Sequence, residues 1–206
     1  MAKLVQAKLK IEGTRPLFWH WFGPDAIPLE RVERTGVAGN DPEEWRRTSL
    51  VLPDGTLYLP GNYAFATLRA GAFHTKRGKG SLMKPVSATM QVVNEIIKVD
   101  RKFPGWHEGA DLRTIEPPPR DPTQSVYLDV RSAVNPSTKA RNVRYRVVAS
   151  PGWQVEFQIE WDPTIVSKPE MEAIAIDAGR LVGLANARTI GMGRFEVRSF
   201  EMVDAA

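Results

Sequence analysis

The amino-acid sequence predicts an α+β fold: an antiparallel sheet with the element order βαββαβ, enlarged by insertions and long loops. Two observations predict it. The hydrophobic pattern along the chain follows the order strand, helix, several strands, helix, strand. In addition, apolar residues occupy every second position from Val155 to Trp161, with polar residues between them. Such alternation is typical of a strand with one solvated face in an antiparallel sheet.

Length and composition indicate one globular domain, residues 1–206. Of the 206 residues, 42% are hydrophobic and 25% are charged, and a domain typically takes about 100–200 residues. The absence of cysteine excludes disulfides, thiolate metal sites and a thiol nucleophile. No apolar run is long enough to cross a bilayer, and the first residues lack the apolar stretch of a signal peptide. We therefore expect a cytoplasmic protein without membrane contact.

The first half of the chain is expected to hold strands, one helix and a basic loop. Its first elements are a half-buried strand at 3–13, an aromatic cluster at 16–24, a polar loop at 24–50 with a short helix near 42–47, and a hairpin at 49–59 that turns at 53–55. A helix follows, with Asn62 as its N-cap, and runs to about His74. The segment 75–81 is expected to be a flexible, glycine-rich basic loop.

The second half is expected to be mostly β-structure. Its elements are a strand at 90–99, a loop at 101–123, strands at 125–130 and 139–148 joined by a turn at 135–137, the alternating strand at 153–161, and a last strand at 194–203. A second helix is expected to begin at Ser167, an N-cap residue, with Pro169 in its first turn. Its buried stripe should consist of Met171, Ile174, Ala175, Ala178, Leu181 and Val182.

The distribution of charge favours a polyanionic partner. The net charge is only +4, but two segments, 55–94 and 130–155, together hold ten of the 28 basic residues and no acidic residue. Basic segments on an otherwise acidic chain are typical of proteins that contact phosphates. The candidate nucleic-acid-binding residues are Arg69, His74, Lys76, Arg77, Lys79, Lys84, Arg131, Lys139, Arg141, Arg144 and Arg146. Strand alternation directs Tyr145 toward the core and leaves Arg144 and Arg146 as an exposed stripe.

The remaining polar residues favour neither a cofactor nor a metal. The three histidines, His20, His74 and His107, show no metal-ligand spacing. The segment 78–81 reads Gly-Lys-Gly-Ser, but it follows a helix and lacks the upstream glycine of a nucleoside-triphosphate loop. His20 lies between two tryptophans and is expected to be structural, whereas His74 lies beside cations and suits a phosphate contact.

A glycine-rich loop precedes the last expected strand. Gly183-Leu-Ala185 is followed, after five residues, by Gly191-Met-Gly193-Arg194. This spacing resembles that of the RAMP superfamily, the RRM-like proteins of CRISPR effector complexes, in which two Gly-x-Gly motifs separated by five residues precede the last strand. Ala185 stands at a glycine position, which narrows the backbone conformations available there. The resemblance marks Gly183, Gly191, Gly193 and Arg194 as candidate site residues.

The start of the first expected helix shows a second similarity to that family. The segment 58–69 resembles the Pro-Gly-Ser-Ser-Leu-Lys-Gly-x-Leu-Arg motif of the backbone-type subunits, and Pro60, Gly61, Leu68 and Arg69 match it. Phe65 departs from the motif, because it occupies the position of the family's RNA-contacting lysine.

The resemblance implies a ferredoxin/RRM-like core with an inserted β-hairpin, the thumb, at 124–148. In the family, backbone-type subunits stack along a single strand of RNA, and the thumb interrupts the row of bases. The resemblance therefore implies binding to single-stranded RNA or DNA, RNA before DNA, and self-association or assembly with other effector subunits. A chain of this length also resembles a reduced, phage-encoded relative that acts outside a CRISPR complex.

Three functions remain open from the sequence. The first is a non-enzymatic protein, without cofactor, that binds single-stranded nucleic acid. The second is a metal-independent ribonuclease that uses His20 or His74 as general acid or base. The third is a structural subunit whose basic segments contact an acidic protein. The sequence does not separate RNA from DNA, because that choice depends on contacts to the 2′-hydroxyl group.

Overall fold

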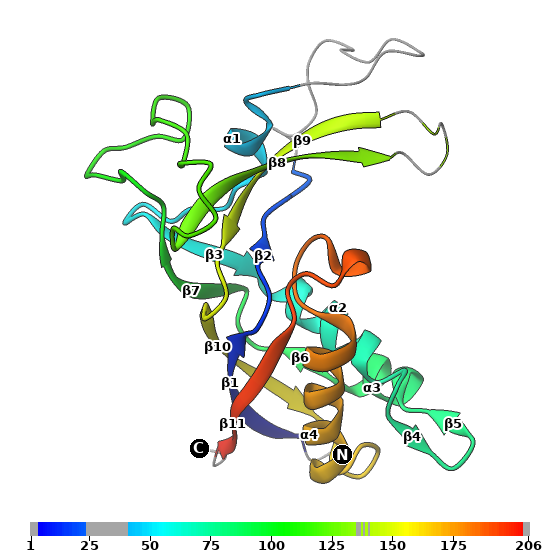
Figure 1. The fold of residues 1–206 in the computed structure, drawn as a ribbon. Helices are drawn as coiled ribbons and strands as arrows, with labels where there is room; N and C mark the ends of the chain where they lie inside the picture. The colour runs from blue at the N-terminus through cyan, green and yellow to red at the C-terminus, as the bar shows by residue number, and fades with distance from the viewer. Residues whose placement is uncertain (1–3, 24–40, 135–136, 138, 140, 204–206) are drawn as a thin grey trace. The chain divides into compact units, whose positions relative to one another are not determined.

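The computed structural model describes residues 4–23, 41–134, 137, 139 and 141–203, drawn in colour in Figure 1. They form two compact units, each built from separate stretches of chain. Unit 1 takes its residues from 1–17, 58–100 and 151–206, and unit 2 takes its residues from 18–57 and 101–150. The single domain expected from the chain length stays a prediction.

The described elements are eleven strands, four α-helices and two short helical turns of other kinds. The strands are β1 (Val5–Gly13), β2 (Leu17–Phe18), β3 (Thr56–Pro60), β4 (Lys76–Arg77), β5 (Gly80–Ser81), β6 (Gln91–Val92), β7 (Ile96–Lys102), β8 (Val126–Val134), β9 (Arg141–Ala149), β10 (Gln154–Trp161) and β11 (Phe195–Val203). The helices are α1 (Glu44–Thr48), α2 (Gly61–Gly71), α3 (Met83–Thr89), α4 (Lys168–Asp177), the π-helical turn η2 (Ala178–Val182) and the 3₁₀ turn η3 (Arg188–Ile190).

The main sheet confirms the predicted α+β fold. Its strands lie in the order β11-β1-β10-β7-β3, and β6 pairs with β10. The strand β1 is antiparallel to both neighbours, with Ala7 opposite Ile159 of β10 and Met202 of β11. With α2 after β1 and α4 after β10, the element order is βαββαβ, and the last strand lies beside the first, as in ferredoxin-like folds.

The core of unit 1 lies between the apolar face of this sheet and two helices. The alternation predicted for 153–161 is confirmed, because every second residue of β10 from Val155 to Trp161 is buried. The helices α2 and α4 contact each other, and Leu68 and Ile174 are both about fully buried. The indole N–H of Trp161 donates to the carbonyl of Val166 at 2.8 Å, which satisfies the one polar atom of a side chain that is otherwise surrounded by apolar groups.

The start of α4 was predicted correctly, and its end was not. Ser167 and Glu170 form a capping box, in which the carboxylate of Glu170 accepts hydrogen bonds from the backbone N–H of Ser167 at 2.9 Å and from its hydroxyl at 2.8 Å. After Asp177 the helix widens into η2, where the N–H of Gly183 donates to the carbonyl of Ala178, five residues back. The extra residue in this turn rotates Leu181 out of the predicted buried stripe, and it is 49% exposed.

Several expectations for the first half are corrected. The helix α2 begins after Pro60, so Asn62 lies in its first turn and is not the N-cap, and α2 ends at Gly71. The segment 75–81 is a short hairpin of β4 and β5, and the predicted strand at 90–99 is divided into β6 and β7. The turn at 53–55 is confirmed, since the N–H of Leu52 donates to the carbonyl of Thr56 and Gly55 has a positive φ of 83°.

Unit 2 is built on a second sheet, with the strand order β2-β9-β8. The strands β8 and β9 form an antiparallel hairpin in the region predicted for one, with Val126 opposite Ala149 and Val134 opposite Arg141. Its role as a thumb stays a prediction. Residues 24–40 of the predicted polar loop, and residues 135–136 of the predicted turn, lie outside the described part of the chain.

No helix within the described ranges is long and apolar enough to cross a membrane.

The Glu170 carboxylate gives a test of the fold by pH. The Arg77 guanidinium, together with the bonds from Ser167, lowers the pKa of Glu170 to about 2 from 4.5. Because the folded-state pKa is depressed, the stabilisation is complete above pH 4.5 and is lost as pH falls toward 2. We expect Glu170→Gln to lower the thermal midpoint at pH 7 by roughly 2 °C, since the ion pair is partly exposed.

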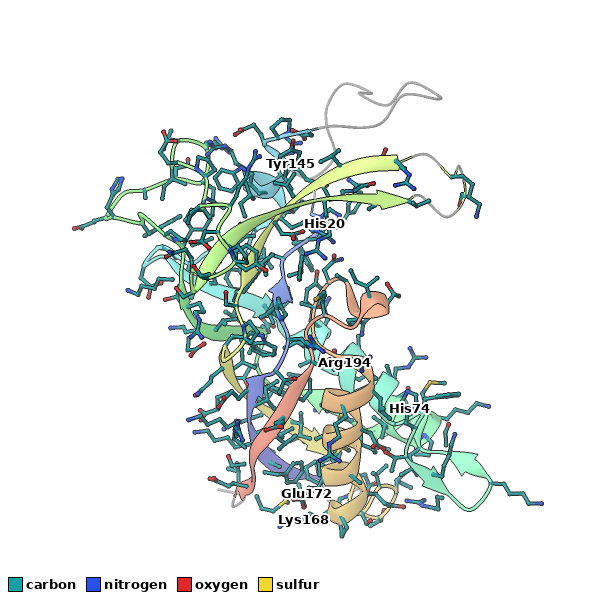
Figure 2. The ribbon with its side chains drawn as sticks, viewed as in Figure 1. His20, His74, Tyr145, Lys168, Glu172 and Arg194 are labelled. Atoms are coloured by element: carbon teal, nitrogen blue, oxygen red, sulfur yellow. The ribbon has the colours of Figure 1, made fainter. Side chains whose placement is uncertain are left out.

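The difference between wild type and Glu170→Gln should shrink as the pH falls from 4.5 to 2, measured by thermal unfolding at each pH. The matched control is Glu172→Gln on the exposed side of the same helix (Figure 2), for which we expect no such convergence. A wild-type-to-variant difference that stays constant over this range would contradict the assigned role of Glu170.

Candidate nucleic-acid interface

The first basic segment forms an exposed surface of unit 1, here called the basic hairpin surface. It is made by the end of α2, the β4–β5 hairpin and the start of α3, and His74 marks it in Figure 2. Its exposed residues outside the Arg77 ion pair are Arg69, Phe73, His74, Lys76, Lys79 and Lys84, and Arg77 is exposed as well. The structure thus brings all six predicted site residues of this segment together at the surface.

Local backbone structure holds this surface in place. The N–H of Leu82 donates to the carbonyls of Ala72 and Thr75, which closes the hairpin onto the end of α2. The side chain of Lys76 donates to the carbonyl of Phe73 at 2.8 Å, and Arg69 donates from Nε to the hydroxyl of Ser87 at 2.8 Å. These bonds use only part of each donor set, since an ammonium group has three N–H bonds and a guanidinium group has five.

Arg77 is the member of this segment whose charge is compensated. Its Nε and Nη2 atoms donate to the two carboxylate oxygens of Glu170 at 2.7 and 2.6 Å, and Nη2 also donates to the carbonyl of Ile165 at 2.8 Å. Most of its donors are therefore occupied, so Arg77 fixes the hairpin to the start of α4 and adds little to the positive potential of the surface.

An exposed aromatic ring lies among these cations, and the sequence did not single it out. Phe73 is 51% exposed. The ammonium nitrogen of Lys76 lies 4.6 Å from the centroid of its ring, and the His74 ring contacts it edge to face at 5.4 Å. Its position directly before His74 in an acid-free segment could have indicated a binding role for Phe73. The helical spacing of the apolar residues there suggested a core residue instead.

The second basic segment differs from its prediction, because carboxylates compensate its arginines. Arg131 donates from Nε to both oxygens of Asp129, at 2.9 and 2.7 Å. Arg144 donates to Oε1 of Glu44 at 2.6 Å, while Oε2 of that carboxylate accepts the N–H of Tyr145 at 2.9 Å. Glu44 belongs to α1 and Asp129 to β8, so both acids lie outside the acid-free stretch 130–155.

Arg146 was predicted to be exposed, and this is wrong. It is only 7% exposed, because it stands opposite Asp129 in the β8–β9 ladder and its guanidinium lies 4.9 Å from the centroid of the Phe18 ring. Its Nη2 atom is 3.7 Å from the Asp129 carboxylate, and burial lowers the pKa of Arg146. In this hairpin, Lys139 and Arg141 are the predicted residues that are exposed.

The other predictions for unit 2 agree better with the structure. Tyr145 is buried, 8% exposed, as its place in the strand indicated. His20 is largely buried, with Nδ1 3.9 Å from the Glu44 carboxylate. Burial lowers the pKa of His20, and the charges of Arg144 and Arg146 lower it further against the opposing effect of Glu44. His20 therefore belongs to this charged cluster as a neutral ring at pH 7.

The glycine-rich loop has the backbone conformation that its residues suggested. Gly183, Gly191 and Gly193 have positive φ angles of 91°, 80° and 68°, and Ala185 adopts 62°. A Cβ atom on Gly193 would lie 2.0 Å from the carbonyl oxygen of Leu184, so no other residue fits there. The three glycine N–H groups donate to the carbonyls of Ala178, Arg188 and Pro16, so contacts to an anion must come from neighbouring side chains.

Three arginines, including Arg194, line an open cleft beside this loop, of about 410 Å³. Arg15 follows the end of β1, Arg180 lies in η2, and Arg194 precedes β11, as the label in Figure 2 shows. Sequence reasoning missed the first two. Little in the sequence indicated these two arginines as site residues. A glycine lies near each of them, but neither arginine belongs to one of the two basic segments.

The solvent-facing side of the main sheet is a mixed ladder of charges in which acids predominate. Lys8 pairs with Glu156 at 2.7 Å, and Arg198 donates to Glu12 at 3.1 Å. The charged residues that β1, β10 and β11 place on this face are Lys8, Lys10, Arg198, Glu12, Glu156, Glu160, Glu196 and Glu201. In their described parts, these three strands place no aromatic residue there, so they offer no base-stacking platform like that of RNA-binding sheets.

In the described part of the chain, no group of three or more His, Asp or Glu side chains is placed to hold a metal ion.

Comparison with solved structures identifies the fold. A chain in the structure "Cryo-EM structure of the Type III-B Cmr-beta bound to cognate target RNA" matches with a TM-score of 0.51 and 14% sequence identity. The match covers 99% of this chain and 62% of that chain, so this protein spans less than two thirds of that chain's length. A scan of protein-family models gives no match, nor does a search of curated proteins. The protein therefore has the fold of a chain in a type III-B Cmr-β assembly.

The compensation of the hairpin arginines can be tested by removing one acid. Asp129→Asn leaves Arg146 without its carboxylate in a buried site, and we expect the free energy of unfolding to fall by about 3 kcal/mol. The measurement is chemical denaturation. Arg141→Gln, at the exposed end of the strand β9 that also holds Arg146, should change the free energy of unfolding by less than about 0.5 kcal/mol. Equal effects of the two substitutions would show that Asp129 is not a structural partner.

Proposed function

We propose that this protein binds single-stranded nucleic acid, RNA before DNA, through the basic hairpin surface of unit 1. The observation that carries the proposal is the composition of that surface: four exposed cationic side chains, an exposed histidine and an exposed aromatic ring gathered within residues 69–84. The segment 55–94 has no acidic residue of its own, and of its basic side chains only Arg77 is drawn into an ion pair that the structure describes.

This combination suits a single strand better than a duplex. The cations supply contacts to successive phosphates, which are independent of sequence and sensitive to salt. The ring of Phe73 offers a face on which an unpaired base can stack, and bases in a duplex are already stacked on one another. Lys76 lies over the same ring, so one phosphate contact and one stacking contact are close enough for a single nucleotide.

The fold supports RNA as the polymer. A structurally similar chain comes from a type III-B Cmr-β assembly bound to cognate target RNA. By this likeness we propose that the protein is a short relative of the RAMP subunits of CRISPR effectors, which self-associates along the strand or joins other effector subunits. Lys139 and Arg141, exposed near the end of the β8–β9 hairpin, supply a smaller second set of phosphate contacts.

We propose binding without catalysis. His20 is largely buried beside Arg144 and Arg146 and is neutral at pH 7, so a substrate phosphate has little access to it. His74 is exposed and its ring packs against Phe73, which suits a binding role. Incubation of the protein with labelled single-stranded RNA in EDTA tests this: intact RNA is expected, whereas cleavage that disappears in a His20→Ala or His74→Ala variant would establish the ribonuclease instead.

Self-association along the strand has its own test. The purified protein is sized, and its 260/280 absorbance ratio measured, before and after ribonuclease and deoxyribonuclease treatment. We expect large particles with a high ratio that shrink with ribonuclease alone. A single fixed size and a protein-like ratio, unchanged by either enzyme, would contradict assembly along a nucleic acid and favour a protein-interaction subunit.

The phosphate contacts predict a specific loss of affinity. The triple variant Lys76→Ala, Lys79→Ala, Lys84→Ala should bind single-stranded RNA on the order of tenfold more weakly, and the slope of log K against log salt should fall by about 2. Fluorescence anisotropy at several salt concentrations measures both. The matched control, Lys8→Ala, Lys10→Ala, Lys98→Ala, removes the same charge from the main sheet of the same unit. If both triples lower affinity equally, only the net charge matters and the proposed surface is wrong.

The stacking contact predicts a loss of a different kind. Phe73→Ala should weaken RNA binding by about 1–3 kcal/mol while leaving the salt slope unchanged, because a ring carries no charge. Phe73→Tyr keeps an aromatic face and should retain the affinity of the wild type. An alanine variant that binds as well as wild type, or a tyrosine variant as weak as alanine, would exclude base stacking at this position.

A further inference from the structure

The cleft beside the glycine-rich loop has the composition of an anion site. Its volume is about 410 Å³, within the range of about 300–1,000 Å³ that is usual for small-ligand sites. Arg15, Arg180 and Arg194 line it, together with Thr14 and one acid, Glu196. The carboxylate of Glu196 lies 3.0 Å from the guanidinium of Arg198, which also pairs with Glu12. The lining of the cleft holds three cations and one acid, so its net charge is positive.

Tight backbone contacts hold the three arginines at one place, although they come from three distant parts of the chain. The N–H groups of Thr14 and Arg15 both donate to the carbonyl of Arg194, at 2.8 and 3.2 Å. The carbonyl of Arg15 accepts the indole N–H of Trp153 at 2.8 Å. These bonds fix Arg15 beside Arg194 and keep the backbone of both from relaxing away from each other.

Arg180 is brought to the same cleft by the residue before it. Gly179 lies so close to β11 that a Cβ atom there would stand 2.3 Å from the carbonyl oxygen of Phe195. The π-helical turn η2 therefore packs directly on the start of β11, and Arg180 lines the cleft with Arg194. Three arginines that line one cleft give it a positive potential, so binding of an anion there would stabilise the fold.

One donor of a cleft arginine lacks a partner. Within the described residues, Nη1 of Arg194 is buried from solvent and makes no hydrogen bond. A buried charged donor without a partner is costly, so an acceptor that reaches it adds stability. Guanidinium groups pair with phosphate oxygens through two parallel N–H bonds, and they do so better than any other side chain.

We propose that this arginine cleft binds the terminal phosphate of a nucleic-acid strand, and the proposal rests on the strand-binding function argued above. An internal phosphodiester carries one negative charge, whereas a terminal phosphate monoester carries about 1.5 to 2 and has three free oxygens. Three arginines in one cleft supply one guanidinium for each of the three free oxygens, and their positive charge favours the monoester, which carries more negative charge than the diester. In this proposal, phosphates within the strand bind instead to the open basic hairpin surface.

The test compares strand ends. Single-stranded RNA oligonucleotides of one sequence are prepared with a 5′-phosphate, with a 3′-phosphate and with hydroxyl groups at both ends, and their affinities for the full chain are measured by anisotropy. We expect one of the two phosphorylated strands to bind about tenfold more tightly than the hydroxyl strand, the effect of one further charge-assisted hydrogen bond. A parallel arm measures whether adenosine monophosphate raises the thermal midpoint more than adenosine does.

The variants Arg15→Gln and Arg180→Gln test whether the cleft binds the terminal phosphate. Both side chains are exposed, and neither is needed to fill the core. Each should abolish the preference for a phosphorylated end and the effect of adenosine monophosphate. Arg69→Gln, on the basic hairpin surface, should weaken all three strands alike and keep the preference. Arg194→Gln is informative only if it retains the wild-type thermal midpoint.

The outcomes separate this proposal from the function it rests on. Equal affinity for all three strands, reduced in Arg180→Gln for every strand, would assign the cleft to internal phosphodiesters and overturn the end-recognition proposal while strand binding stands. Equal affinity that is unaffected by Arg15→Gln and Arg180→Gln would leave the cleft without a role in binding. No binding to any strand would overturn both proposals.

Discussion

The strand β1 is the element on which the rest of unit 1 depends. It is hydrogen-bonded along its length to β10 on one side and to β11 on the other, which places Ala7, Leu9 and Ile11 at the centre of the buried face. Because the last strand of the chain pairs with the first, the end of β1 lies next to the start of β11. Arg15 and Arg194 meet for this reason, so the arginine cleft is a direct product of the sheet order.

Carboxylates from distant parts of the chain decide which of the basic residues are available to a partner. Glu170 occupies Arg77 at the start of α4. In unit 2, Glu44 pairs with Arg144, and Asp129 pairs with Arg131 and Arg146. A guanidinium that already holds a bidentate carboxylate offers few donors to a phosphate. The two basic segments look alike in composition, yet one forms an exposed surface and the other mainly a structural ion-pair cluster.

The two proposed binding surfaces of unit 1 suit different parts of a nucleic-acid strand. The basic hairpin surface is open, carries flexible lysines and includes a ring, so it suits successive internal nucleotides. The cleft is concave, holds its arginines on a rigid backbone and leaves one guanidinium donor unsatisfied, so it suits a single group of higher charge. Acids predominate in the mixed charge ladder of β1, β10 and β11, so we expect a bound strand to avoid this side of the sheet.

The sequence by itself determined the elements whose causes are local: the alternating strand β10, the N-cap at Ser167, the turn at Gly55 and the order of strands and helices along the chain. Side-chain period and cap chemistry act within a few residues, so they can be read without the fold. Tertiary structure alone decided that Arg146 is buried, that Arg77 is paired and that three arginines share a cleft. Each of these depends on partners from elsewhere in the chain, such as Asp129 and Glu170, and no local pattern records them.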